Sequence, residues 1–427
     1  MADLANGYTI KTKNFRKIVV GKKLGEGGQG AVYQVNYDGK QKALKWYSGK
    51  KLSNPDKFYQ NLENNIKKGK PTNAFLWPED ITEKDGEAFG YIMDLRTNEY
   101  VDFTKILLGK KKEHAFASIT AMCNASLQII DGFGELHRKG YSYQDLNDGN
   151  FFINTKTGEV LICDNDNVSE AGKNSGIAGK ARYMAPEIVA KGKMPDKYTD
   201  RFSLAVVLFL LWTKNHPLEG KAAFPVCMDT KHEKKIYGES PVFIFDPNDD
   251  SNRPVQGLNK GAIANWPFLP VYLQEQFQKA FGKEALQDPA RRIQELEWLR
   301  TFIRLRSEIY KCPCGEVYFA DPVNLNPCPS CKKQNKFAFY LKFGRYNVAV
   351  HQRTKLYACH TEKDSDDFQT LTGEVAAKGS DFELKNISSK NWTVTDGGNT
   401  SSVVPNAVIM LKKDITINFG NAQAEII

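Results

Sequence analysis

The first part of the chain alternates apolar and polar positions around glycines. Between residues 15 and 47 the pattern runs through KIVVGKKLGEGGQGAVYQVNYDGKQKALKWY, and it predicts antiparallel strands joined by tight turns. Phe58, Leu62 and Ile66 follow at helical spacing, and residues 90–95 form a short apolar segment typical of a strand. A small β region with one helix is therefore expected at the start of the protein.

A mostly helical region is expected next. Helical spacing predicts helices through residues 127–138, 201–212 and 274–306. Residues 219–270 are dense in Pro, Gly, Asn and Asp and lack a clear period, which predicts an elaborated loop. From residue 337 to 427, short alternating segments such as YNVAVHQ, DFELKNIS, WTVT and ITINFG recur between turn residues, and they predict a β-sandwich.

Length and composition indicate a globular chain of more than one domain. The 427 residues exceed a single hydrophobic core, which stops growing near about 250 to 300 residues. The chain is 41% hydrophobic and 26% charged, which excludes a mainly disordered protein. Its longest apolar run has nine residues, whereas a membrane-spanning helix needs about 20. With no apolar signal segment at the start, a cytoplasmic location is expected. The net charge of +9 suits an anionic partner without choosing among nucleotide, nucleic acid and acidic protein.

Four of the eight cysteines lie close together in the last third of the chain. They form C-P-C and C-P-S-C, separated by 13 residues, so that four thiolates can surround one tetrahedral zinc ion. The predicted ligands are Cys312, Cys314, Cys328 and Cys331. The first pair is one residue closer than the common C-x-x-C, which leaves another metal or incomplete occupancy open. We expect a structural zinc ribbon in a reducing compartment. Because Lys332, Lys333 and Lys336 lie close by, nucleic-acid binding is a weaker alternative than a basic solvated face.

Three glycines between two predicted strands form a candidate phosphate loop. Gly25, Gly27 and Gly30 give G-x-G-x-x-G, and Val32 follows; without side chains, the backbone can approach phosphates closely. Alone, the motif fits an ordinary glycine hairpin equally well. Lys45, one strand later, changes that balance because its ammonium can reach the α and β phosphates. A strand after the glycines argues against a dinucleotide fold.

Lys45 needs a carboxylate to hold it in place. Glu63 is the acid between Asp56 and Glu79, and it lies on the predicted helix. We therefore expect Glu63 to pair with Lys45. The alternative is a solvated charge on the helix surface.

Three later segments complete the pattern. They are YQDLNDGN at residues 143–150, LICDND at 161–166 and YMAPE at 183–187. At these residues the chain resembles the eukaryotic-like protein kinase family, over roughly residues 15–305. The resemblance depends on five ordered elements rather than on any one motif.

The resemblance implies a role for each matching residue. Asp145 matches the catalytic-loop base, while Asn150 and Asp164 match the two ligands that hold magnesium against the phosphates. The alternative for these residues is an acid-rich turn between a helix and a hairpin. Met93 stands where the family places the residue that gates the back of the adenine pocket. The nucleotide-binding residues implied in addition to the glycines and Lys45 are Val32, Ala43, Met93, Asp94 and Leu95.

Two further matches are structural. Asp200 resembles the aspartate of the family's central buried helix, which ties down the catalytic-loop backbone, and a plain helix N-cap is its alternative. Arg292 resembles the late arginine that pairs with the glutamate of A-P-E, here Glu187.

The chain also departs from the family pattern. Gln144 replaces the arginine that reads a phosphorylated activation loop, so activation is expected not to depend on loop phosphorylation. Asn147 replaces the lysine that neutralises the transferring phosphate, which predicts slower transfer or a substitute cation. Lys180 stands where serine/threonine kinases place a threonine near the substrate residue.

The segment after Ile162 is also unusual. In D-N-D, Asn165 and Asp166 replace the family's phenylalanine and glycine, which puts the usual hydrophobic switch of this segment in doubt. Asp166 is expected as a solvated turn acid in preference to an additional metal contact.

The last domain resembles forkhead-associated phosphopeptide-binding sandwiches in its second half. Residues 386–393 follow D-L-G-S-x-N-G-T with Trp392 replacing glycine, and residues 411–420 follow a later pattern of that family. Since no arginine, serine and histidine set matches the phosphothreonine grip, a degenerate interaction domain is favoured over a working reader.

Together these features predict an α+β chain. A two-lobed protein-kinase-like fold, with a small β lobe and a large helical lobe, is expected over residues 15–306, a zinc ribbon over 307–336 and a small β-sandwich over 337–427. The resemblance implies a serine/threonine protein kinase with ATP, Mg²⁺ and Zn²⁺. The arrangement of the chain is similar to that of kinases found beside von Willebrand factor A-like proteins and 2C-type phosphatases in bacterial stress and tellurite-resistance clusters. This similarity implies that proteins of these two classes are partners.

Two alternatives remain. An ATP-binding pseudokinase scaffold explains the loss of the catalytic-loop lysine, but gives no reason for the retained glycine-loop lysine, catalytic aspartate and metal ligands. A small-molecule kinase shares these groups, but the A-P-E segment and Arg292 argue against it.

Overall fold

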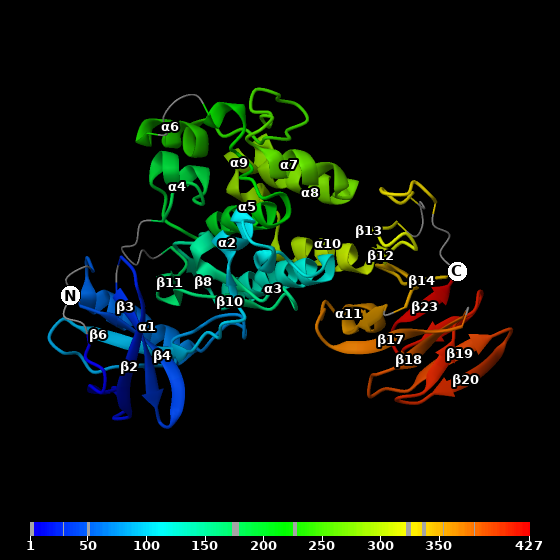
Figure 1. The fold of residues 1–427 in the computed structure, drawn as a ribbon, viewed down its shortest axis with the longest axis horizontal. Helices are drawn as coiled ribbons and strands as arrows, with labels where there is room; N and C mark the ends of the chain where they lie inside the picture. The colour runs from blue at the N-terminus through cyan, green and yellow to red at the C-terminus, as the bar shows by residue number, and fades with distance from the viewer. Residues whose placement is uncertain are drawn as a thin grey trace. The chain divides into compact units, whose positions relative to one another are not determined.

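The chain forms two compact units in the computed structural model (Figure 1). The structure describes residues 4–28, 30–48, 52–172, 179–224, 229–321, 326–334, 339–352, 354–379 and 381–427. The first unit holds residues 1–117 and 128–295, and the second holds residues 118–127 and 296–427. Among the described residues, no helix has the length and apolar character needed to cross a bilayer.

A six-stranded sheet opens the first unit, in the order β1-β2-β3-β4-β6-β5. Its strands are β1 (Thr9–Lys11), β2 (Lys17–Glu26), β3 (Gly30–Tyr37), β4 (Lys40–Tyr47), β5 (Asp80–Ile81) and β6 (Phe89–Asp94). Helix α1 (Pro55–Lys68) begins after Asn54, whose side chain accepts a hydrogen bond from the Lys57 backbone at 2.9 Å. It packs Phe58 and Leu62 against this sheet. The predicted β region and its helix are confirmed.

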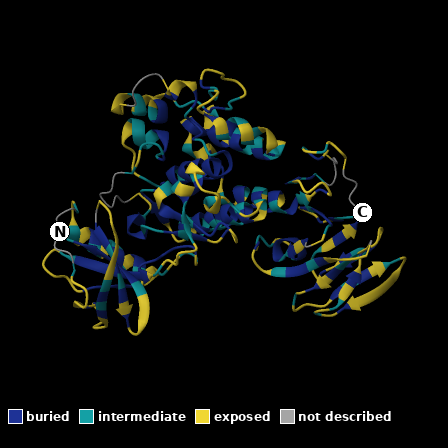
Figure 2. Cartoon of the chain, viewed as in Figure 1, coloured by how far each residue is buried: buried dark blue, intermediate teal, exposed yellow. Residues whose placement is uncertain are grey.

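The rest of the first unit is mainly helical. Its helices are α2 (Phe103–Leu108), α3 (Ile119–Arg138, shared with the second unit), α4 (Pro186–Lys191), α5 (Lys197–Thr213), α6 (Thr230–Lys234), α7 (Lys260–Asn265), α8 (Val271–Phe281) and α9 (Lys283–Gln287). Short strands between them are β7 (Val101–Asp102), β8 (Tyr141–Tyr143), β9 (Phe151–Ile153), β10 (Val160–Ile162) and β11 (Val168–Glu170). Helix α5 is buried along most of its length, as Figure 2 shows in dark blue. The predicted helix over residues 274–306 is instead divided among α8, α9 and a later helix.

The stretch from residue 219 to 270 is more than the predicted loop. It contains α6, α7 and a π-helical turn over Lys235–Glu239. Phe243 and Trp266 pack against Phe209 of α5, and the rings of Phe245 and Trp266 stack at 4.3 Å. Its aromatic residues therefore extend the core, a role that an irregular spacing conceals.

The longer segment of the second unit begins in helix α10 (Glu295–Ser307), whose first residue belongs to the first unit. A hairpin of β12 (Ile309–Lys311) and β13 (Val317–Phe319) follows. One sheet then orders β15 (Asn347–Ala349), β14 (Tyr340–Lys342), β23 (Gln423–Ile426), β22 (Thr416–Asn418), β19 (Trp392–Asp396) and β20 (Asn399–Val403). The other orders β16 (Lys355–Tyr357), β17 (Leu371–Lys378), β18 (Asp381–Asn386) and β21 (Val408–Met410), with helix α11 (Ala358–Thr361) after β16.

These two sheets share one apolar core. Buried side chains from each sheet form a single cluster, and Trp392 packs edge-on against Phe419 at 4.9 Å. The shared core confirms the predicted β-rich region as a sandwich. The boundary predicted at residues 336 and 337 lies outside the described residues.

Helix α10 is tied to the sandwich by Arg306. Its guanidinium donates to Asn124 Oδ1 at 3.0 Å and to the Phe368 carbonyl at 2.8 Å, and it lies 3.9 Å from the Tyr357 ring centre. Ser307 and His360 add a buried hydrogen bond of 2.9 Å. The sequence assigned α10 to the kinase-like region, whereas the structure groups residues 296–307 with the sandwich.

A buried histidine fixes the start of the catalytic loop. His137 Nε2 lies 3.0 Å from Asp200, and its Nδ1 lies 2.9 Å from Glu295. Asp200 also accepts a 2.7 Å hydrogen bond from the Tyr143 backbone. The N-cap of α5 is Asp196, so the alternative role of Asp200 as an N-cap is wrong. Although burial lowers the pKa of His137, its hydrogen bonds to the two carboxylates raise the pKa to about 9.

Replacing His137 with alanine should lower the free energy of unfolding by about 3 kcal/mol, because Asp200 and Glu295 lose their shared cation. The histidine contribution is full below its unfolded pKa of about 6.5 and is lost as the pH rises through about 9. Calorimetric melting from pH 6 to 10 tests both points. Arg138→Ala changes an exposed neighbour on α3 and should shift stability by less than about 0.5 kcal/mol. Equal melting temperatures for the two variants would contradict this assignment.

Candidate active site

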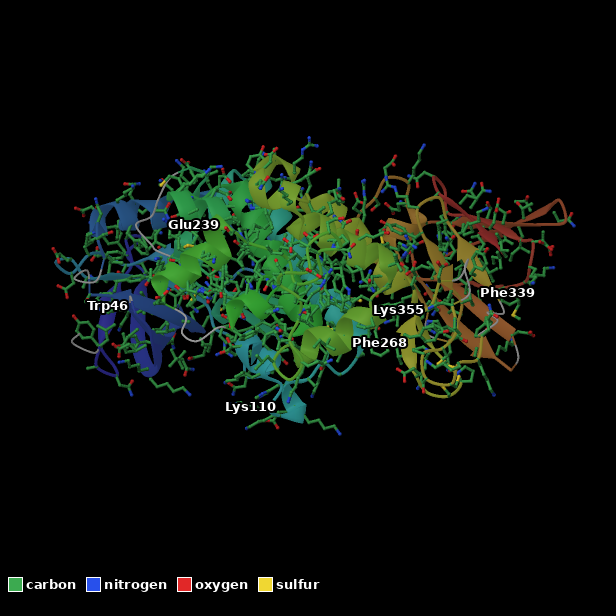
Figure 3. All side chains as sticks on the ribbon, turned by 90° about the horizontal axis from the view of Figure 1, so that it is seen from above. Trp46, Lys110, Glu239, Phe268, Phe339 and Lys355 are labelled. Atoms are coloured by element: carbon green, nitrogen blue, oxygen red, sulfur yellow. The ribbon has the colours of Figure 1, made fainter. Side chains whose placement is uncertain are left out.

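The glycines of the glycine loop have two different surroundings. Among the described residues, a Cβ atom at Gly25 would meet no atom within 4 Å, and one at Gly27 would lie 4.0 Å from the nearest atom. At Gly30, a Cβ atom would lie 2.4 Å from the carbonyl oxygen of Trp46, the β4 residue labelled in Figure 3. Among the described residues, Gly25 and Gly27 therefore border open space, while Gly30 is required by the close approach of β3 and β4.

The predicted apolar nucleotide-binding residues lie together. Ala43 and Met93 belong to the buried cluster, and Val32 and Leu95 pack against it. Leu161 and Cys163 join the same cluster from the segment around β10. Asp94 lies at the end of β6, where its carboxylate accepts a 2.6 Å hydrogen bond from Lys42. The arrangement provides an apolar wall next to Val32, and the sequence analysis missed the contributions of Leu161 in β10 and Cys163 directly after it.

Lys45 is held by two carboxylates. Its ammonium lies 3.0 Å from Asp164 Oδ1 and at 3.0 and 2.9 Å from the oxygens of Asp166. Burial alone would lower the pKa of Lys45, but the charges of Asp166 and Asp164 raise it above its usual value. Lys45 therefore stays protonated in its buried position.

Asp166 is neither a solvated turn acid nor exposed to a metal ion. Its residue exposure is 0%, and its carboxylate accepts hydrogen bonds from the hydroxyls of Tyr47 at 2.6 Å and Tyr91 at 3.2 Å. The expected solvated acid is therefore wrong. The side chain of Asp164 is 48% exposed, so it is the acid of this segment that a metal ion can reach.

The expected pair between Lys45 and Glu63 is not formed. Glu63 forms an ion pair with Lys13 instead. Helix α1 turns Phe58, Leu62 and Asn65 inward, and this rotation leaves Glu63 on another face.

Helix α1 contacts the site through amides. Asn61 and Asn65 donate to the Val168 carbonyl at 2.8 and 2.9 Å. The helix thus holds the segment after Asp166, not Lys45.

Polar contacts also anchor the middle of the D-N-D segment. Asn165 is buried and donates to the carbonyls of Leu76 and Ile162, each at 2.8 Å. Asp164 adopts a left-handed conformation with φ of 54°, which directs the neighbouring residues to different sides. Backbone hydrogen bonding replaces the hydrophobic packing expected of this segment in the family.

The catalytic loop brings Asp145 beside a new pair of residues. Asn147 Nδ2 donates to Asp145 Oδ1 at 3.2 Å, and Lys180 Nζ donates to Asn147 Oδ1 at 3.0 Å. Burial raises the pKa of Asp145 to about 6, although the Asn147 hydrogen bond and the Lys180 charge lower it. Asn150 is buried and donates to the Tyr143 hydroxyl at 2.9 Å.

Gln144 ties this loop to β11. Its side-chain amide donates to Ser169 Oγ, and its backbone N–H donates to Asn167 O at 3.2 Å. A neutral contact thus occupies the place of the family's arginine.

The large lobe contains the expected late pair. Arg292 donates to both oxygens of Glu187, at 2.9 and 2.6 Å. A neighbouring ion pair, missed in the sequence, joins Arg182 to Glu219, which also accepts from the Tyr237 hydroxyl at 2.7 Å. These pairs hold residues 182–187, at the end of the segment that follows the D-N-D turn.

Comparison with known families agrees with this geometry. Residues 18–263, more than half of the chain, match the protein kinase domain family. The chain belongs to the protein kinase family.

Several bacterial proteins resemble this kinase. A probable serine/threonine-protein kinase, PknB of Corynebacterium glutamicum, is 24% identical over 256 residues, which cover 57% of this chain and 38% of the relative. Protein kinase YegI of Escherichia coli O157:H7 is 21% identical over 346 residues, covering 78% and 51%. The chain thus spans about half or less of these relatives. The PknI kinase domain of Mycobacterium tuberculosis aligns at 20% identity with a TM-score of 0.45, over 69% of this chain and 96% of that structure.

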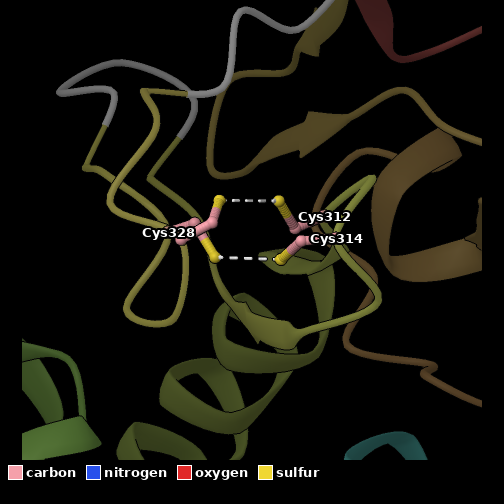
Figure 4. A group of neighbouring side chains, drawn as sticks. Cys312, Cys314 and Cys328 are labelled. Atoms are coloured by element: carbon pink, nitrogen blue, oxygen red, sulfur yellow. Dashed lines mark hydrogen bonds between the residues drawn. The ribbon is translucent and has the colours of Figure 1, made fainter.

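The second unit of this kinase contains the cysteine cluster. Figure 4 shows Cys312 and Cys314 facing the loop that carries Cys328. The sulfurs of Cys312 and Cys331 are 3.7 Å apart, as are those of Cys314 and Cys328, and all four lie within 4.8 Å of one another. Four thiolates at 2.3 Å from a tetrahedral zinc ion are about 3.8 Å apart. The four sulfurs therefore fit one zinc ion, despite the shortened first pair.

Zinc content tests the cluster directly. Purified wild-type protein should contain about one zinc ion per chain by elemental mass spectrometry. Cys328→Ser should lose it and lower the melting temperature, because zinc binding contributes to folding. Ser330→Ala, an exposed position in the same loop, is the matched control and should retain zinc. Full zinc occupancy in the Cys328 variant would contradict the four-thiolate site.

Proposed function

We propose that this kinase transfers the γ-phosphoryl group of MgATP to a serine or threonine hydroxyl of a partner protein. The observation that carries the proposal is the 3.0 Å contact between Lys45 and Asp164, which are 119 residues apart. It brings together the lysine beside the glycine loop and the exposed acid after β10. Membership in the protein kinase family and the named relatives support this activity.

Each group has a distinct task. Lys45 positions the α and β phosphates against the open space at Gly25 and Gly27. Asp164 and Asn150 supply the carboxylate and amide oxygens that would hold magnesium, which neutralises phosphate charge when bound. Asp145 accepts the proton of the attacking hydroxyl.

A cavity beside the catalytic loop supports a protein substrate. It has a volume of about 520 Å³, and its lining includes Gln144, Met184, Ile188 and Met194. Such a surface suits an apolar side chain of an acceptor protein. The Arg292–Glu187 pair also favours a protein kinase over a small-molecule kinase.

The second unit is proposed to hold a zinc ribbon and a partner-docking sandwich related to forkhead-associated domains. Residues 386–393, which suggested this relation, begin with the buried Asn386. Its side chain donates to the carbonyls of Lys390 and Val403 and accepts a hydrogen bond from Ser388. Von Willebrand factor A-like proteins and 2C-type phosphatases are proposed partners from the sequence resemblance. A cytoplasmic location would keep the cysteine thiols reduced for zinc.

A transfer assay with γ-labelled ATP and magnesium tests the activity. Wild-type protein should label hydroxyls of itself or of an added basic protein, whereas Asp164→Ala should reduce transfer by at least about 100-fold. Phosphoamino-acid analysis identifies the acceptor type. Binding of MgATP by the wild-type protein without transfer would reject the kinase proposal and favour a pseudokinase scaffold.

A further inference from the structure

We infer that Asp166 is the positioning residue for Lys45 in this kinase, in place of the helix glutamate expected at Glu63. The inference depends on the proposed phosphoryl transfer. It is argued from the buried contacts of Asp166, which stands where the family pattern has a glycine.

The contacts of Asp166 fix Lys45 from the inner side of the site. Both carboxylate oxygens lie within 3.0 Å of the ammonium. The hydroxyls of Tyr47 and Tyr91 donate to the same carboxylate from β4 and β6. An ionised acid with several donors is stable in a buried position, so its geometry is strongly determined.

In this arrangement Asp164 and Asp166 have different roles. Asp164 is half exposed and carries one contact to Lys45, so it is free to turn toward a metal ion. Asp166 is fully buried, so it can keep the Lys45 ammonium in place when Asp164 turns toward a metal ion. The lysine is therefore anchored by the segment after β10, with no side-chain contact to Glu63 of helix α1.

The matched test compares Asp166→Asn with Glu63→Gln. Each change removes one charge with little change in shape. Asp166→Asn should lower kcat/KM for ATP by about 100-fold, because a misplaced lysine no longer meets the phosphates, whereas Glu63→Gln should stay within about twofold of wild type. Calorimetric titration with MgATP provides a second readout: the Asp166 variant should bind more weakly, and the Glu63 variant should bind normally.

The outcomes separate the two proposals. If the wild-type protein transfers phosphate and Glu63→Gln abolishes transfer while Asp166→Asn retains it, the inference is overturned and the kinase activity stands. If the wild-type protein binds MgATP without transfer, the proposed function fails, and the titration still decides which acid holds Lys45. Asp166→Glu keeps the charge and should recover part of the ATP affinity; its failure to exceed Asp166→Asn, with both variants folded by thermal melting, would argue for a purely structural role.

A different contact carries a second inference. We propose that Lys180 supplies the positive charge that the catalytic loop lacks because Asn147 replaces the family's lysine. Lys180 Nζ lies 3.0 Å from Asn147 Oδ1 and 3.9 Å from Asp148, and Asn147 in turn contacts Asp145. The ammonium thus contacts the side chain that replaces the usual lysine, and that side chain also contacts Asp145.

The side chain of Lys180 is also positioned for a substrate. It is 61% exposed, so a phosphoryl group can displace its contact with Asn147 without desolvating a buried charge. A cation there would stabilise the charge of the transferring phosphate. This inference also depends on the proposed transfer reaction.

Moving the charge back tests this role. Lys180→Met should lower kcat by about 100-fold with little change in KM for ATP. The double variant Asn147→Lys with Lys180→Met should recover most of the loss. Lys156→Met, an exposed lysine, is the control and should behave as wild type. An unchanged kcat in Lys180→Met, or no recovery in the double variant despite normal melting, would overturn the inference, while inactivity of the wild-type protein would instead reject the transfer reaction.

Discussion

The buried ion pair between Lys45 and Asp166 is the interaction on which the rest of the catalytic site depends. It joins a strand of the small lobe to the segment after β10, and both of its side chains are buried. Loss of one partner from such a pair typically costs about 3 to 5 kcal/mol, because the other charge stays buried. The hydrogen bonds of Asn165 and Val168 extend from this fixed point toward β10 and α1.

Polar contacts replace several features of the family pattern at once. Gln144 reaches Ser169 where an arginine would read a phosphate, and Asn165 bonds to backbone carbonyls where a phenylalanine would pack. The donors of both replacements are paired within the lobe, whereas the buried Oδ1 of Asn165 has no hydrogen-bond partner among the described residues. Internal hydrogen bonds therefore hold this part of the site, and the independence of activation from loop phosphorylation stays a prediction.

Periodicity predicted the first sheet, α1 and the β-rich second unit because each contains one buried face repeated along the chain. The side-chain partners were harder to predict. Glu63 was expected to pair with Lys45 because it is the only acid between Asp56 and Glu79, but the rotation of α1 that turns Asn65 inward with Phe58 and Leu62 leaves Glu63 beside Lys13. The burial of Asp166 depends on the left-handed turn at Asp164, and the Lys180 contact joins residues 33 apart. Neither arrangement leaves a periodic signal.

The guanidinium of Arg306 has a consequence for dividing the chain. Its aromatic and carbonyl partners lie in the sandwich, well beyond the end of α10. A fragment that stops at residue 306 would keep the cation and remove the groups that cover it, together with the histidine bonded to Ser307. The kinase-like sequence therefore ends inside a helix whose packing partners lie in the sandwich, so a cut at residue 306 would uncover the inner side of α10.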